Sequence, residues 1–166
     1  MKRILNIKNL GLLLLVFSLF SFHKLENKVA NKTIKCLIQI KNYSGEGAYI
    51  AISLVDAKGT YKETLYVVGD DEKWYETVEE WWKHLGKSAS NLDALSGATI
   101  NPGARSIIAF EIPEDKIDAG YSLRFESAVE DQDYHVKDLE FPLTTASLKQ
   151  KLEGTGYVRY VRLMSN

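Results

Sequence analysis

The chain has 166 residues, about one domain, with 45% hydrophobic residues and a formal net charge of −1. Because its charges are balanced in sign, no basic face of the kind expected for nucleic-acid binding stands out in the sequence. The single cysteine, Cys36, excludes an internal disulfide framework, and we expect it to be a small buried hydrophobe rather than a reactive thiol.

The first part of the chain resembles an export segment. Three basic residues open it: Lys2, Arg3 and Lys8. The apolar run Leu10–Phe22 that follows is shorter than the roughly 20 residues that span a bilayer, which is typical of a secretory signal. No clear small-x-small cleavage site follows, so a retained anchor remains the alternative. We expect 1–30 to be a signal peptide or N-terminal anchor and 31–166 to be a single β-rich domain, exported to the periplasm or the outer face of the cytoplasmic membrane.

Most of the remaining chain is predicted to form short strands. They are Thr33–Lys41, Ala48–Val55, Thr64–Val68, Arg105–Ile112, Tyr121–Val129, His135–Phe141 and Tyr157–Leu163. In the first strand Ile34, Cys36, Ile38 and Ile40 alternate on one face, and Asp56–Gly59 is a plausible hairpin turn. Several short strands separated by turns favour an antiparallel sandwich or a partly open barrel.

One segment has a helical pattern instead. Thr77–Glu80 matches a capping box, in which the threonine and glutamate side chains satisfy each other's backbone amides. Val78, Trp81, Trp82 and Leu85 then follow at helical spacing, before Gly86. These signals predict one short helix over Thr77–Leu85. The long loop after it is of a kind that is often functional.

That loop contains the run Asp93-Ala94-Leu95-Ser96-Gly97-Ala98-Thr99. It resembles the Asp-x-x-Ser/Thr-Gly-Ala-Thr motif that ApbE-type flavin transferases recognise, which also occurs in flavin-carrying subunits of the sodium-pumping quinone reductase and the Rnf complex. The resemblance implies that FMN, taken from FAD, becomes esterified through its phosphate to Thr99. It also implies a cofactor-binding site made of Asp93, Ser96, Gly97, Ala98 and Thr99.

The residue types of this motif suit that chemistry. Gly97 and Ala98 leave the backbone free of bulk where a modifying enzyme must approach. The Thr99 hydroxyl needs activation by another protein, because its own pKa is far too high. Asp93 and Ser96 either hold the turn by hydrogen bonds from their side chains to the backbone or are recognised by the transferase. The alternative is a small, polar surface turn without a cofactor.

A wider resemblance extends over about Ile34–Glu130. It is carried by the runs Leu65–Asp70, Trp81-Trp82 and Pro102-Gly103 around the motif. In these the chain is similar to a bacterial periplasmic family classified as a domain of unknown function, many of whose members share the flavinylation motif. The resemblance implies a β-sandwich with electron-transfer partners at the membrane. Ala119–Arg124 also resembles the closing strand of immunoglobulin-like repeats, so we expect an immunoglobulin-like sandwich.

Three tryptophans near the motif, Trp74, Trp81 and Trp82, are candidates for stacking on the isoalloxazine ring. The alternative is that they simply dock the helix on a sheet. Because adjacent helical residues point about 100° apart, we expect one of Trp81 and Trp82 in the core and the other at the loop. Lys87 and Arg105 flank the loop, where surface charge explains them better than phosphate binding. We expect no metal site.

These observations favour an exported electron carrier rather than an enzyme with its own substrate. Its expected partners are an ApbE-type flavin transferase and a membrane redox protein that donates or accepts electrons, with no nucleic acid. The main alternative is a cofactor-free exported binding or scaffold module that stacks a sugar on its tryptophans. A small envelope enzyme is a weaker alternative, because the sequence shows no catalytic constellation.

Overall fold

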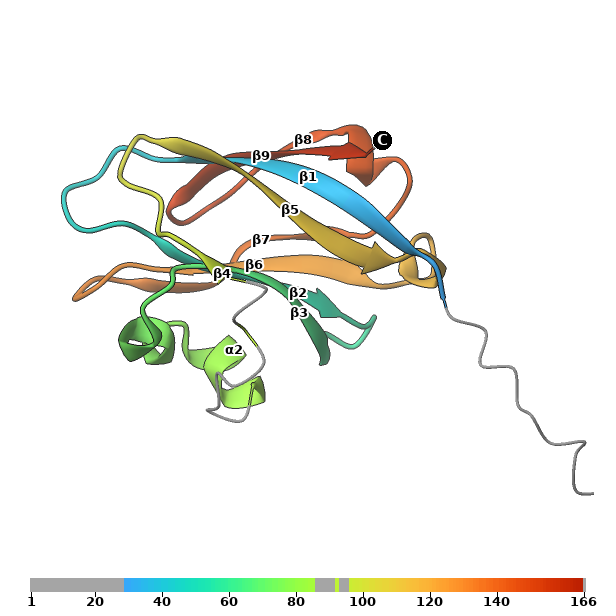
Figure 1. Ribbon diagram of the computed structural model, residues 1–166, viewed down its shortest axis with the longest axis horizontal. Coiled ribbons are helices and arrows are strands. Elements are labelled where there is room, and N and C mark those ends of the chain that lie inside the picture. Colours follow the sequence, from blue (N-terminus) through green and yellow to red (C-terminus); the bar gives the residue numbers. More distant parts are fainter. Residues whose placement is uncertain (1–28, 86–91, 93–95, 166) are drawn as a thin grey trace, which may run out of the picture.

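The computed structural model describes residues 29–85, 92 and 96–165, which form two β-sheets packed face to face (Figure 1). This confirms the predicted mainly β sandwich. The predicted export segment lies almost wholly outside the described residues. Within the described part, no helix is both long and apolar enough to cross a membrane.

The first sheet has the strand order β5-β1-β9-β8 and is antiparallel throughout. Its strands are β5 (Arg105–Pro113), β1 (Asn31–Ile40), β9 (Val158–Ser165) and β8 (Lys151–Glu153). Side chains of β1 alternate as predicted: Ile34, Cys36, Ile38 and Ile40 are buried, and the residues between them are exposed or half-buried. Burial raises the pKa of the Cys36 thiol to about 12, so this cysteine is a packing residue.

The second sheet has the order β4-β3-β2-β6-β7. Its strands are β4 (Ser96–Gly97), β3 (Tyr61–Val68), β2 (Tyr49–Val55), β6 (Ser122–Ala128) and β7 (Tyr134–Pro142). All pairs are antiparallel except β3 with β4, which run parallel. The predicted turn joins β2 to β3: the Gly59 amide donates to the Asp56 carbonyl at 2.8 Å, and Gly59 adopts φ +77°.

The main core lies between the two sheets. It includes Ile34 and Ile38 of β1, Ile52 of β2 and Phe125 of β6, all fully buried. Short 3-10 turns complete the rim of the sandwich: η2 (Glu114–Lys116) and η3 (Ser147–Lys149). Every described member of this core and of the second cluster comes from 34–163, so the chain from residue 29 onward contains all the described core residues.

A helical layer covers the outer face of the second sheet (Figure 1). It consists of η1 (Glu72–Thr77), a 3-10 turn that the sequence did not predict, and α2 (Glu79–His84). Tyr75, Val78 and Trp81 form a second buried cluster with Tyr49, Ala51 and Val67 of the sheet. One helical segment docked on the sheet is therefore confirmed, although it is shorter than Thr77–Leu85.

The predicted capping box was wrong. The Thr77 hydroxyl donates to the Trp74 carbonyl at 2.6 Å instead of capping the helix. The first amides of α2 are satisfied from the sheet: the Glu80 amide donates to Tyr134 Oη at 3.0 Å, and the Trp81 amide donates to Glu126 Oε2 at 3.2 Å. Tyr134 and Glu126 belong to β7 and β6, so the cap comes from residues far away in sequence.

Candidate functional site

The second half of the motif lies at the end of the second sheet, where it continues along the edge of β3. Ser96 and Gly97 form β4 beside Val67 and Val68, and the Gly69 amide donates to the Gly97 carbonyl. Three residues later, Ile100 pairs with Ala48 through hydrogen bonds of 2.9 and 3.3 Å. Ala98 and Thr99 therefore lie on a short bridge that is paired to the sheet at both ends. Asp93 and Lys87 lie outside the described residues.

Thr99 is half-buried and Ala98 is exposed, so this bridge is open to solvent. The Thr99 side chain packs against Gly47 in the β1–β2 loop. A Cβ atom placed on Gly47 would lie 2.5 Å from Thr99 Oγ1, which is too close for any real side chain. Gly47 thus makes room for the Thr99 hydroxyl, a role that could not be recognised from the sequence.

Gly97 has a packing role of its own. A Cβ atom at this position would lie 2.7 Å from Tyr66 Oη, so any larger residue displaces the tyrosine. Tyr66 is half-buried on β3 and packs against the main core. The glycine of the motif is therefore explained by the fold, whether or not a modifying enzyme approaches it.

Ser96 connects the motif to the aromatic cluster, which we define as Tyr49, Tyr75, Trp81 and Trp82. Burial raises the pKa of Tyr75, and a side-chain hydrogen bond with Ser96 opposes that rise. The Tyr75 hydroxyl also donates to the Gly69 carbonyl at 3.0 Å, next to the amide that holds Gly97. The Tyr75 ring lies 5.3 Å from Trp81 and 5.9 Å from Trp82, between ring centroids.

The three tryptophans differ in exposure. Trp81 is fully buried, and its indole Nε1 donates to Thr64 Oγ1 at 2.9 Å. Trp82 and Trp74 are half-buried. The expectation that one of Trp81 and Trp82 lies in the core is confirmed, and it is Trp81. Only Trp74 and Trp82 keep ring surface that a ligand could meet, so stacking stays a prediction for these two.

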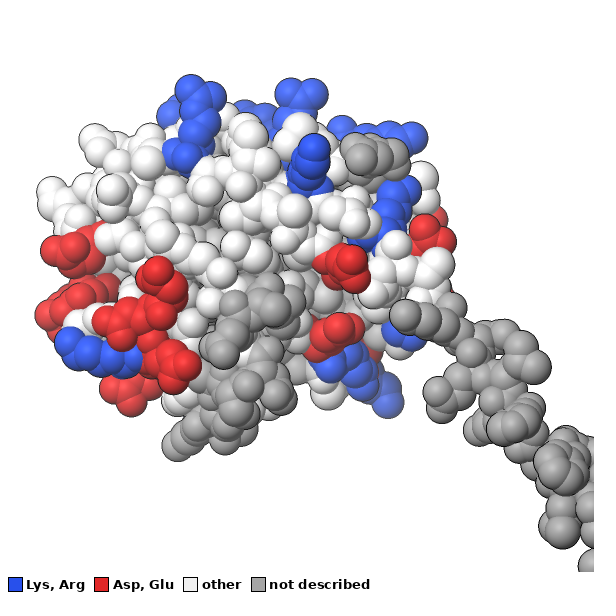
Figure 2. Space-filling view, in the orientation of Figure 1, with Lys and Arg blue, Asp and Glu red and all other residues white. Residues whose placement is uncertain are grey.

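The surroundings of the motif are acidic. Burial, followed by the charges of Asp71 and Asp70, raises the pKa of Tyr49 to about 12, and Glu130 adds to the effect. These carboxylates come from the segment after Gly69 and from the β6–β7 turn. Figure 2 shows Asp and Glu side chains gathered at this end of the second sheet. A phosphate group at this end would therefore be repelled unless cationic groups accompany it.

A scan against protein-family models matches residues 31–160 to the family described as "Predicted periplasmic protein (DUF2271)". The chain belongs to the DUF2271 family. The periplasmic description confirms the expected export and the predicted relation to a periplasmic domain of unknown function. Searches of the curated proteins and of the solved structures found no match.

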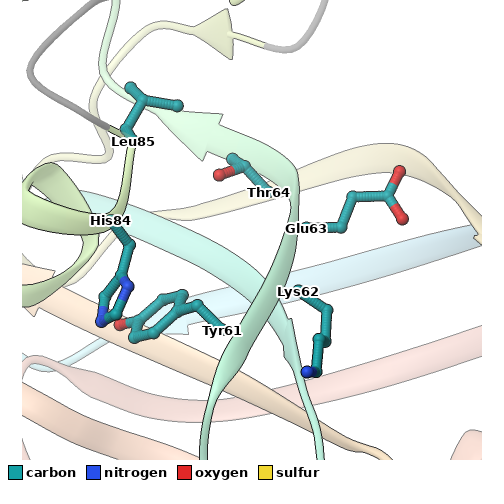
Figure 3. Close-up of a pocket in the computed structure, with 6 residues that line it drawn as sticks. All are labelled: Tyr61, Lys62, Glu63, Thr64, His84 and Leu85. Carbon is teal, nitrogen blue, oxygen red and sulfur yellow. The ribbon is translucent and has the colours of Figure 1, made fainter.

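Two hollows lie along β3 of this DUF2271 domain. The first, about 240 Å³, lies beside the last turn of α2, where His84 stacks on Tyr61 with ring centroids 4.2 Å apart (Figure 3). No described motif residue lines it. The second, about 360 Å³, runs between β3 and β5 and includes Tyr66, the neighbour of Gly97, together with Phe110. Of the two, only this groove has a wall that contacts the motif.

Beneath α2 lies a buried carboxylate that the sequence analysis did not single out. Glu126 is fully buried, and its Oε2 accepts hydrogen bonds from Tyr134 and from the Trp81 amide. Burial raises its pKa to about 7, and these hydrogen bonds only partly oppose the rise. Among the described atoms, Glu126 Oε1 has no hydrogen-bond partner. Glu126 holds the helical layer on the sheet and is a structural group rather than part of the motif.

Proposed function

We propose that this DUF2271 domain is an exported electron carrier with FMN attached covalently to Thr99. The observation that carries the proposal is the position of Thr99. It is the last residue of a flavinylation-like motif, half-buried on a solvent-facing bridge that is paired to the sheet on both sides. A transferase can reach such a hydroxyl without unfolding the domain.

Attachment is a phosphoryl-type transfer that leaves the redox state of FAD unchanged. The Thr99 oxygen attacks the FMN phosphorus of FAD, the pyrophosphate bond breaks and AMP leaves, and the hydroxyl proton passes to a base of the transferase. A threonine hydroxyl is too weakly acidic to attack unaided, and the carboxylates that act on Tyr49 at this end of the sheet repel phosphate. Activation is therefore the task of an ApbE-type transferase, which makes this chain the substrate of that reaction.

The residues present fit a tethered flavin in two respects. Ala98 and Thr99 are on an accessible bridge, and the β3–β5 groove with Tyr66 begins beside Gly97. When bound, FMN supplies one- and two-electron redox chemistry. The charges of Asp71, Asp70 and Glu130 help to raise the pKa of Tyr49, and by the same repulsion they would disfavour the added negative charge of a reduced flavin held at this end.

The test is coexpression of the full chain with an ApbE-type transferase, followed by intact-mass measurement under denaturing conditions. The proposal predicts a mass gain equal to FMN minus water, and yellow colour that survives denaturation. Thr99→Ala should lose both, whereas Thr33→Ala, which removes an exposed hydroxyl on β1, should keep both.

Absence of the mass gain, with a transferase that modifies a known substrate in parallel, would contradict the proposal. It would favour the cofactor-free module, whose half-buried Trp74 and Trp82 then become the surface to examine for sugar binding.

A further inference from the structure

The outer face of the β5-β1-β9-β8 sheet lies on the side of the sandwich opposite the helical layer, and it combines cations with exposed apolar side chains. We propose that this basic face docks the domain onto an anionic phospholipid surface. The inference does not rest on flavin attachment, because it uses no residue of the motif.

Strand register places the side chains of the basic face in neighbouring rows. Lys35 on β1 is opposite Ala109 on β5 and Met164 on β9. The next row is Ile107, Leu37, Arg162 and Lys151, one from each strand. The third row holds Arg105, Gln39, Tyr160 and the one carboxylate of these three rows, Glu153. All of them alternate with buried core residues, so they point away from the core.

Most cations of this face lack an ion pair, as do Lys58 and Lys73 elsewhere on the described surface, whereas several other lysines are paired. Lys62, Lys83 and Lys137 on the other sheet and its helical layer form ion pairs of 2.6–3.0 Å with Asp56, Glu80 and Glu140. Among the described residues, Lys35, Arg105 and Arg162 have no such partner within 4.0 Å, and Lys151 has only the long contact of 3.5 Å to Glu153. Figure 2 shows Lys and Arg side chains gathered over this sheet and Asp and Glu below it.

Apolar side chains project from the same face. Ile107 is 62% exposed and Met164 is 37% exposed, and they are two of the four exposed large hydrophobic residues in the described chain. Leu37 lies next to Ile107 across the strand pair and is half-buried. Such residues surrounded by Lys and Arg suit the boundary between lipid headgroups and acyl chains.

Two observations favour a membrane over an acidic protein as the occupant. The cations are spread over a sheet face instead of converging on one point, so they suit the negative potential of an anionic membrane surface. Each Lys or Arg near such a surface contributes about 1 kcal/mol to binding. In addition, β1 of this face begins at Asn31, nine residues after the end of the apolar run Leu10–Phe22, which would hold this face near the membrane if it is retained as an anchor. Docking through this face leaves β4 and the Thr99 bridge, which belong to the other sheet, uncovered.

The experiment is vesicle co-sedimentation with the chain from residue 29 onward, which contains both cores and lacks the apolar run. Vesicles contain equal parts of phosphatidylcholine and phosphatidylglycerol, or phosphatidylcholine alone. The proposal predicts binding to the anionic vesicles only, with release by salt. Lys35→Glu with Arg162→Glu should weaken binding at least about 10-fold, because the double variant reverses two charges of the face. Ile107→Ser should weaken it a few-fold.

The matched control is Lys62→Glu with Lys83→Glu, which reverses two exposed charges on the opposite side and should leave vesicle binding unchanged. Circular dichroism confirms that each variant is folded. The proposal is overturned if the wild-type domain does not bind anionic vesicles at low salt, or if both double variants weaken binding equally. It is also overturned if the domain binds polyglutamate but not the vesicles, since the partner is then an acidic protein.

Discussion

The two sheets of this sandwich differ in what lies on their outer faces. The β4-β3-β2-β6-β7 sheet is covered by η1 and α2, so all seven residues of β2 are buried. The β5-β1-β9-β8 sheet has no such cover, and β1 alternates between buried and open positions. The same strand chemistry thus gives a second core on one side and a solvent-exposed face on the other.

The covered face also holds polar groups that the open face lacks. Glu126, Ser53 and Trp81 lie on it or against it, fully buried, and Glu126 Oε1 and Ser53 Oγ have no hydrogen-bond partner among the described atoms. Substitutions on the covered face should therefore change stability strongly, whereas those on the open face should affect binding and leave stability nearly unchanged. The predictions below test this contrast.

The largest effect should come from Trp81→Ala. It removes a fully buried indole that packs on Tyr75 and bonds Thr64, so it should cost about 3–5 kcal/mol of unfolding free energy. Leu37→Ala on the open face should cost less than about 1 kcal/mol, because that side chain is only half-buried. Urea denaturation measures both. Similar losses in the two variants would show that the faces are not energetically distinct.

Next in size is a pH effect from Glu126. Its pKa of about 7 in the folded state lies above the ordinary value of 4.5, so the folded state binds the proton more tightly. The contribution of Glu126 to stability should therefore be highest below about pH 4.5 and fall by roughly 2–3 kcal/mol as the pH rises to about 7.

Glu126→Gln should remove this fall, since a glutamine oxygen still accepts from Tyr134 and the Trp81 amide without becoming charged. Glu111→Gln, which changes an exposed carboxylate on the open face, should leave it in place. Urea denaturation at pH 5 and pH 8 measures the difference. If the free energy of unfolding of Glu126→Gln falls between pH 5 and pH 8 as much as that of the wild type, another group causes the pH dependence.

A smaller effect is expected at the motif. Gly97→Ala places a methyl group against Tyr66 Oη and should lower the free energy of unfolding by about 1 kcal/mol. Thr99→Ala should lower it by less than about 0.5 kcal/mol. In a Tyr66→Phe background the Gly97→Ala cost should shrink, because the hydroxyl it meets is absent. If Gly97→Ala lowers the free energy of unfolding as much in the Tyr66→Phe background, the added methyl group clashes with something other than the Tyr66 hydroxyl.

Much of the fold could be predicted where the signal is local. The alternation from Ile34 to Ile40 and the turn Asp56–Gly59 depend on neighbouring residues, and both are as expected. The cap of α2 could not be predicted, because it comes from Glu126 and Tyr134. β4 and β8 are too short to show a period, having two and three residues.

The candidate site was found only in part. The motif and Thr99 came from resemblance, whereas Gly47 and Tyr66, which shape the space around it, lie some 50 and 30 residues away in sequence and show no pattern that connects them to it. Trp81 is the converse case, because the expectation that one of Trp81 and Trp82 lies in the core is confirmed for it. Proximity in sequence suggested a ligand platform, and the structure makes it the centre of the second core.

Peptide mapping of the chain after coexpression with the flavin transferase tests the central claim most directly. Proteolysis and tandem mass spectrometry locate the FMN on a single residue. The account predicts FMN on Thr99 alone, in a peptide that also contains unmodified Ser96. Flavin on Ser96 or Thr77, or on no residue of the chain, would contradict it.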